Sequence, residues 1–326
     1  MKKFFKANSR EFSVVVAIAF MFLIFGIMEP IYVSAQNIRD IMEQSTIYGL
    51  MAIGITGVII TGGIDLSVGS ALALIGAVVA QAAVAGIPIP ICILLGLAFG
   101  FGLGFLNGTL ITRLSLQPFI ATLGTMSVFR GLAYVVTGGY PVLGVPDSYR
   151  MVVDGEVLPF IRISTLVFFA FVVIMYIILK KTKFGTYIYS IGGNEEATRL
   201  SGVKVHSNKT MIYAIAMIGT ALAAMIQIGK LGTGDPTTGQ GYELNAIAAA
   251  AIGGTSMAGG RGNVFGTLLG AILFAGLKVG LIVLGVDTFY QYIATGLVII
   301  AAAYIEVVQT KLSNKVKNDT VKRVTE

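Results

Sequence analysis

Long apolar runs with few or no charges recur along this 326-residue chain and limit what it can fold into. A helix crosses a bilayer core about 30 Å thick with about 20 apolar residues. Ten spans fit into the runs 12–28, 44–64, 66–112 (two spans), 114–136, 163–179, 210–229, 244–260, 262–284 and 288–305. The sequence therefore predicts an all-α, polytopic membrane helix bundle of about ten transmembrane helices, with residues 1–326 forming a single transmembrane domain.

Composition excludes other broad classes. Charged residues make up 12% of the chain, whereas they approach about a quarter of a soluble domain. The formal net charge of +7 would suit nucleic acid, but the basic residues are spread along the chain and form no patch. We therefore predict a multi-pass protein of the lipid bilayer with no nucleic-acid partner.

The positions of lysine and arginine predict the orientation in the membrane. Cytosolic loops are enriched in these residues, and ten spans with a cytosolic N-terminus place most of the 23 on the cytosolic side. Both termini, the loop 181–209 and the tail 310–326 are then cytosolic. Arg130 lies alone within an apolar run, where it is either a snorkelling residue or a partner for a polar cluster, and of the two we expect it to snorkel towards the membrane surface.

Residues 180–209 are the most strongly charged segment inside the chain, and they lie between two apolar runs. Asn194 is a favoured N-cap, Glu195 and Glu196 complement the positive end of a helix, and Gly202 can end one. We predict a short polar helix at residues 194–202. It either docks a partner in the aqueous phase or simply connects two membrane helices, and only docking explains why a polar helix is held there.

Glycine pairs interrupt the apolar pattern at residues 61–70 and 252–262, in opposite halves of the chain. Their placement suggests an internal repeat whose broken or re-entrant helices line a pathway. Asp65 is the one carboxylate that we expect at membrane depth. Two roles stay open for it: capping the helix that starts at Leu66, or contributing directly to the pathway.

The residues of catalytic and metal sites are missing. His206 is the only histidine and Cys92 the only cysteine, and no G-x-x-x-x-G-K-[ST] phosphate loop occurs. We therefore expect a transport subunit that is not an enzyme and has no cofactor or metal. If transport uses ATP, another chain must bind the nucleotide.

Four ordered motifs carry a resemblance to a known family. They are residues 62–70, 117–125 and 192–202, and residues 241–248 with 252–256. At these motifs the chain resembles the permease subunits of bacterial ABC sugar importers, the ribose-type branch. The resemblance implies a bacterial cytoplasmic-membrane permease, as a homodimer or paired with another permease. It also implies two cytosolic ATPase subunits and an external sugar-binding protein as partners.

The resemblance also implies roles for particular residues. The ATPase-coupling segment would consist of Gly193, Asn194, Glu195, Glu196, Ala197, Thr198, Arg199, Leu200, Ser201 and Gly202. Relatives often carry a small residue at the position of Glu196, so the local ATPase contact can differ here. The central translocation positions that match are Gly62, Gly63, Asp65, Ser67, Asn107, Gln117 and Thr122.

The expected cargo is a monosaccharide similar to ribose, delivered by the external binding protein. A sugar-like signal or a nucleoside is the alternative cargo. A gradient-driven carrier or a passive channel is the alternative class. The scarcity of intramembrane charges argues against ion coupling, and the polar helix has no purpose in a channel.

Overall fold

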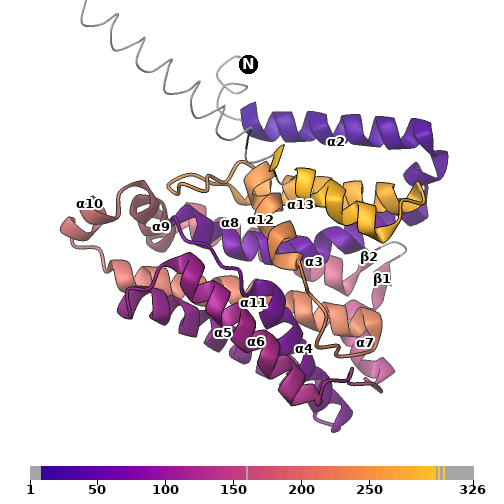
Figure 1. The fold of residues 1–326 in the computed structure, drawn as a ribbon, viewed down its shortest axis with the longest axis horizontal. Helices are drawn as coiled ribbons and strands as arrows, with labels where there is room; N and C mark the ends of the chain where they lie inside the picture. Colours follow the sequence, from indigo (N-terminus) through magenta and orange to yellow (C-terminus); the bar gives the residue numbers. More distant parts are fainter. Residues whose placement is uncertain (1–8, 159–160, 299, 302–303, 305–326) are drawn as a thin grey trace, which may run out of the picture.

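The computed structural model describes residues 9–158, 161–298, 300–301 and 304, and Figure 1 shows its arrangement. The predicted tail 310–326 lies outside these residues. The longer helices are α2 (Ser9–Met28), α3 (Ala35–Ile60), α4 (Val68–Val84), α5 (Ile89–Arg113), α6 (Pro118–Thr137), α8 (Ile163–Lys181), α11 (Val205–Leu231) and α13 (Val264–Val283). The shorter elements are η1 (Pro30–Val33), α7 (Asp147–Asp154), α9 (Lys183–Gly193), α10 (Glu195–Leu200), α12 (Tyr242–Ile252) and the strands β1 (Glu156–Leu158) and β2 (Ile161–Arg162). Residues 288–298 are also helical.

The all-α architecture is confirmed, apart from the small hairpin of β1 and β2. Within the described residues, seven helices are long and apolar enough to cross a membrane, and α4 and α12 are shorter apolar helices. Each of these nine helices overlaps one of the predicted runs. The count of ten spans stays a prediction.

The predicted span 244–260 is wrong in its second half, because α12 ends at Ile252. Gly254, Gly259 and Gly260 adopt φ values of +87°, +86° and +71°, which a right-handed helix does not allow. The chain therefore passes through a non-helical segment before Asn263 caps α13, its side chain accepting from the Phe265 N–H at 3.1 Å.

The centre of the bundle is formed by α3 and α11. Most of their apolar stretches are buried, 89% for α3 and 72% for α11, against 11% for α2. Glycines allow the close approach: Gly54 of α3 lies against the Ala216 backbone, and Gly104 of α5 against the Tyr213 backbone. This small-residue packing is how apolar helices associate without a hydrophobic driving force between them.

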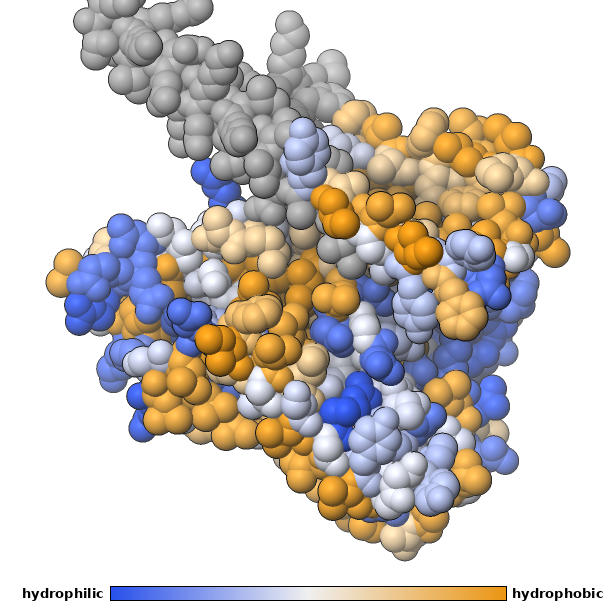
Figure 2. All heavy atoms as spheres, in the orientation of Figure 1, coloured by the Kyte–Doolittle hydropathy of each residue, from blue (hydrophilic) through white to orange (hydrophobic). Residues whose placement is uncertain are grey.

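The two ends of the bundle differ. Figure 1 shows α9 and α10 at one end, and α7 with β1 and β2 at the other. We call these the α10 end and the α7 end. In Figure 2 hydrophilic residues cover the projecting α10 end, whereas apolar residues cover much of the remaining surface. The bundle thus has an apolar exterior between two polar ends, as a membrane protein requires.

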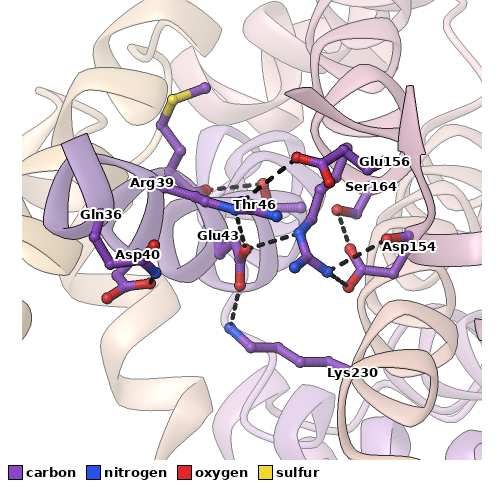
Figure 3. Close-up of polar contacts among 11 residues, drawn as sticks. Gln36, Arg39, Asp40, Glu43, Thr46, Asp154, Glu156, Ser164 and Lys230 are labelled. Carbon is purple, nitrogen blue, oxygen red and sulfur yellow. Dashed lines mark hydrogen bonds and ion pairs between the residues drawn. The ribbon is translucent and has the colours of Figure 1, made fainter. Parts of the chain in front are cut away.

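Helix α3 begins at Ala35, nine residues before the predicted start, and Ser34 is its N-cap, with the hydroxyl accepting from the Asn37 N–H at 3.3 Å. Charged residues in its first turns are paired. The Glu43 carboxylate forms ion pairs with Arg39 at 3.3 Å, Arg162 at 2.9 Å and Lys230 at 2.9 Å (Figure 3). Asp154 pairs with Arg162 at 2.6 Å. This cluster ties the start of α3 to the chain before α8 and to the last turn of α11.

The expectation for Arg130 is wrong, since its guanidinium does not snorkel. It donates hydrogen bonds to the carbonyl oxygens of Pro236 and Thr238, the latter at 2.8 Å. Arg130 therefore fastens α6 to the segment that precedes α12.

Replacing Glu43 with Gln should destabilise the fold, because three cations lose their shared, largely buried carboxylate. We expect a loss of about 2 kcal/mol, measured as a lower apparent Tm of the purified protein in detergent. Glu156→Gln is the matched control: its side chain is 52% exposed and pairs only with Arg39 at 3.5 Å, so the loss should stay below about 0.5 kcal/mol. Equal shifts for both variants would contradict this account of the cluster.

Candidate functional site

The predicted polar helix is present as α10, Glu195–Leu200, and its start follows from Asn194. The Asn194 side chain accepts a hydrogen bond from the Ala197 N–H at 2.9 Å, which satisfies one free donor of the first turn. After Ser201, Gly202 adopts φ +83° and turns the chain out of the helix. The capping expected from the sequence is therefore confirmed at both ends.

Helix α10 presents nearly all of its side chains to the surroundings. Of the predicted coupling residues 193–202, only Thr198 is buried. Arg199 pairs with Glu196 at 2.6 Å in an exposed bridge, and Glu195 pairs at 2.9 Å with Lys209, whose side chain is largely covered. The Arg199 guanidinium holds the pKa of Glu196 below its usual value. Leu200 is 76% exposed at the end of the helix, so α10 offers an apolar contact beside its charges.

Helix α9 connects α10 to the rest of the bundle through backbone contacts. The Tyr189 hydroxyl donates to the Gly262 carbonyl oxygen at 2.8 Å. The Gly260 N–H donates to the Ile60 carbonyl oxygen at 2.8 Å, and a methyl group at Gly192 would overlap that same oxygen. We call residues 60–63, 189–193 and 259–262 the glycine junction.

The glycine junction joins the two glycine-rich segments that the sequence singled out. Residues 60–63 follow α3, and residues 259–262 precede α13, so segments about 200 positions apart touch each other and the end of α9. Asn194 follows directly and begins α10. The junction therefore lies directly before α10 in the chain and contacts both interruptions of the helical pattern.

Three of the predicted translocation residues form a buried polar cluster. Asp65 Oδ1 accepts from the backbone N–H of Ser67 at 2.9 Å and from its hydroxyl at 2.7 Å. The Asn107 amide of α5 donates to the Ser67 hydroxyl at 2.8 Å and lies 3.3 Å from Asp65 Oδ2. All three side chains are at most 1% exposed.

The Asp65 cluster corrects the expected helix start. Helix α4 begins at Val68 with Ser67 at the N-cap, two residues after the predicted start at Leu66. The predicted capping role of Asp65 is wrong, because Ser67 is the N-cap and no side chain caps the first turn of α4. Asp65 instead accepts from the Ser67 N–H and hydroxyl just before the helix. A direct pathway role for Asp65 stays a prediction.

The other predicted translocation residues lie around this cluster or apart from it. Thr122 of α6 is buried and donates to the Ile64 carbonyl oxygen at 3.3 Å. Gly63 lies under the Tyr213 hydroxyl, which donates to the same oxygen at 3.4 Å. Gly62, at φ +76°, and Gln117, at the start of α6, are exposed. The structure thus brings five of the seven residues together.

One polar site was missed by the sequence analysis. A cavity of about 190 Å³ lies between α12, α13 and residues 288–298, and Tyr242, Asn245, Lys278 and Gln291 are among its lining residues. The available signal was Lys278, a lone cation inside an apolar run. In the described part of the chain no group of three or more His, Cys, Asp or Glu residues could hold a metal ion.

Comparison with known proteins identifies the family. Residues 37–303 match the family model described as "Branched-chain amino acid transport system / permease component". The ribose import permease protein of Bacillus subtilis (strain 168) is 44% identical over 288 residues, which cover 87% of this chain and 88% of the relative. The ribose import permease protein of Escherichia coli (strain K12) is 37% identical over 306 residues, covering 93% and 95%.

A third relative is named for the import of a different sugar. The galactose/methyl galactoside import permease protein of Escherichia coli (strain K12) is 35% identical over 323 residues, covering 94% of this chain and 96% of the relative. No solved structure matches the chain. The resemblance seen in the motifs is confirmed: this multi-pass membrane protein belongs to the permease-component family of the branched-chain amino acid transport system type.

Proposed function

We propose that this chain is the transmembrane permease subunit of an ABC importer that passes a monosaccharide across a bacterial cytoplasmic membrane. The observation that carries the proposal is α10, an exposed polar helix held by a backbone junction to both helix interruptions. The relatives' names support the cargo class, since they state ribose and galactose import. Between them, ribose is the cargo we favour, because the most similar of these relatives carries that name.

In this proposal the α10 end faces the cytosol. Basic residues at this end support the orientation, among them Arg113 at the end of α5 and Lys180 and Lys181 at the end of α8. The α7 end then faces outward, where the segment 138–162 would meet the sugar-binding protein. The chain would cross the membrane ten times, with both termini in the cytosol.

The partners follow from the need for an energy source. Two cytosolic ATPase subunits would each receive one α10 helix, with residues 193–202 as the contact. A second permease subunit, identical or paired, would complete the pathway. An external binding protein would deliver the sugar.

We propose that the glycine junction transmits the ATPase motion. Closure of the ATPases displaces α10, and Gly192 bears on the Ile60 carbonyl oxygen and the Gly260 N–H. The junction can have two packings with different affinities for the two ATPase states, which is what coupling between distant sites requires. Gly62, Gly63, Asp65, Ser67, Asn107, Gln117 and Thr122 would then shape the cytosolic part of the pathway.

Replacing Glu195 and Arg199 together with alanine should uncouple ATP hydrolysis from uptake. We expect sugar uptake in proteoliposomes with both partners to fall by about tenfold or more, equivalent to about 1.4 kcal/mol of lost coupling. Lys183→Ala, an exposed residue at the same end, serves as the control. Normal uptake by the double variant, inserted at wild-type levels, would argue against α10 as the ATPase contact.

Gly192→Ala tests the transmission step, with Gly193→Ala as its matched neighbour. A methyl group at Gly192 overlaps the Ile60 carbonyl oxygen, whereas one at Gly193 meets no atom within 4 Å. We expect Gly192→Ala to lower uptake per ATP hydrolysed by about tenfold or more, and Gly193→Ala to preserve it within about twofold. If the two alanine variants transport equally well, the junction does not carry the motion.

A further inference from the structure

The cavity between α12, α13 and residues 288–298 has a mostly apolar wall, which includes Leu244, Phe274 and Leu277, and a few polar groups, the composition of a small-molecule site. Its volume is about 190 Å³, room for several water molecules. Amide side chains line it at Gln240, Asn245 and Gln291, and phenol rings at Tyr242 and Tyr292. Amides can donate and accept hydrogen bonds, and aromatic rings offer flat apolar faces, which together match the hydroxyl groups and C–H faces of a sugar ring.

Lys278 is the charged group of this cavity. Its ammonium donates to the Tyr48 hydroxyl at 2.6 Å and lies 5.2 Å and 6.0 Å from the ring centres of Tyr48 and Tyr242. Among the described residues no carboxylate lies within 4.0 Å of it. An unpaired cation inside a membrane bundle is costly and marks a site where it has a function.

The electrostatic surroundings of Lys278 suit a neutral ligand. The Tyr48 oxygen accepts from the ammonium at 2.6 Å and the Tyr242 ring centre lies 6.0 Å away, so the positive charge already has partners in the protein and needs no anion to balance it. The remaining ammonium protons can donate to hydroxyl oxygens. Tyr48 itself is fully buried and packs edge-on against Tyr242 at 5.0 Å between ring centres, so the ammonium has a rigid support.

The cavity lies at mid-depth in the bundle. Tyr48 is in the middle of the 26-residue helix α3, and α12 begins beside it at Tyr242 instead of at an end of the bundle. Figure 1 shows the segment before α12 running inward from the α7 end to this point. A helix that starts inside the membrane next to a polar cavity is the arrangement expected where cargo is held midway across.

We infer that this cavity binds a neutral monosaccharide during transport, with Asn245, Lys278 and Gln291 donating to its hydroxyl oxygens and Tyr242 and Tyr292 covering its faces. The inference deepens the proposed function and rests on it for the cargo class. Affinity is weak, because a transport site must release what it binds.

Binding can be measured directly because the chain contains no tryptophan. Tyr292→Trp places a single indole at the cavity, where the native side chain is 69% exposed and lines the wall. In the purified full chain in nanodiscs, we expect ribose or galactose to change the emission of this indole saturably in the millimolar range. Phe289→Trp is the control, since Phe289 is 77% exposed on the same helix and does not line the cavity.

Variants in the reporter background test the assigned residues. Asn245→Ala and Lys278→Met should each weaken sugar binding by roughly tenfold, the effect of losing a hydrogen bond in a dry site. Arg113→Met, a cation outside the cavity, should leave binding unchanged. Circular dichroism and elution volume confirm that each variant is folded, and Gln291→Ala replaces any that is not.

The outcomes separate this inference from the proposed function. Saturable binding that depends on Asn245 and Lys278 supports the site, even if the reconstituted protein with its ATPases fails to import the sugar. Successful import with an unchanged Tyr292→Trp spectrum in saturating ribose and galactose overturns the site alone. Binding of a sugar acid such as ribonate without binding of ribose would also overturn it, because the assigned ligand is neutral.

Discussion

The contact of Gly192 with the Ile60 carbonyl oxygen and the Gly260 N–H is the constraint on which the rest of the structure depends. Three chain segments meet there at backbone distance, and only a residue without a Cβ allows it. Because the Gly260 N–H donates to the Ile60 oxygen, the interruption after α3 is bound to the one before α13. The exposed helix α10 begins three residues later, at Glu195, so this polar surface lies close in the chain to the contact between the two interruptions.

Charged side chains inside the bundle are stabilised in three different ways. At the α7 end, Glu43 is shared by three cations, which allows α3 to carry charge where it meets α11. Asp65 is enclosed by hydrogen bonds from Ser67 and Asn107. Lys278 pairs with the Tyr48 hydroxyl but has no carboxylate partner in the described structure, and it borders a cavity. The Asp65 cluster leaves one atom unpaired, Asn107 Oδ1, whereas Lys278 keeps ammonium protons that can donate to a ligand in the cavity.

Two errors of sequence reasoning concern charged residues whose partners are distant in the sequence. The predicted span began after Glu43, but Glu43 lies inside α3 and pairs with Arg162 and Lys230. Arg130 was expected to snorkel, but its guanidinium binds carbonyl oxygens of the segment before α12. In both cases the partners lie more than 100 positions away. By contrast, the capping of α10 by Asn194 and Gly202 was predictable, since both residues act within one helical turn.

The sequence by itself determined the membrane class, the order of the apolar helices, the family and the exposed polar helix. These follow from local rules, because each apolar helix must satisfy its own backbone hydrogen bonds within lipid, and its caps are adjacent residues. Only the tertiary structure decided the glycine junction, the Glu43 cluster and the cavity around Lys278. Each of these joins residues from distant helices, and their positions depend on how the helices pack, which no periodicity along the chain encodes.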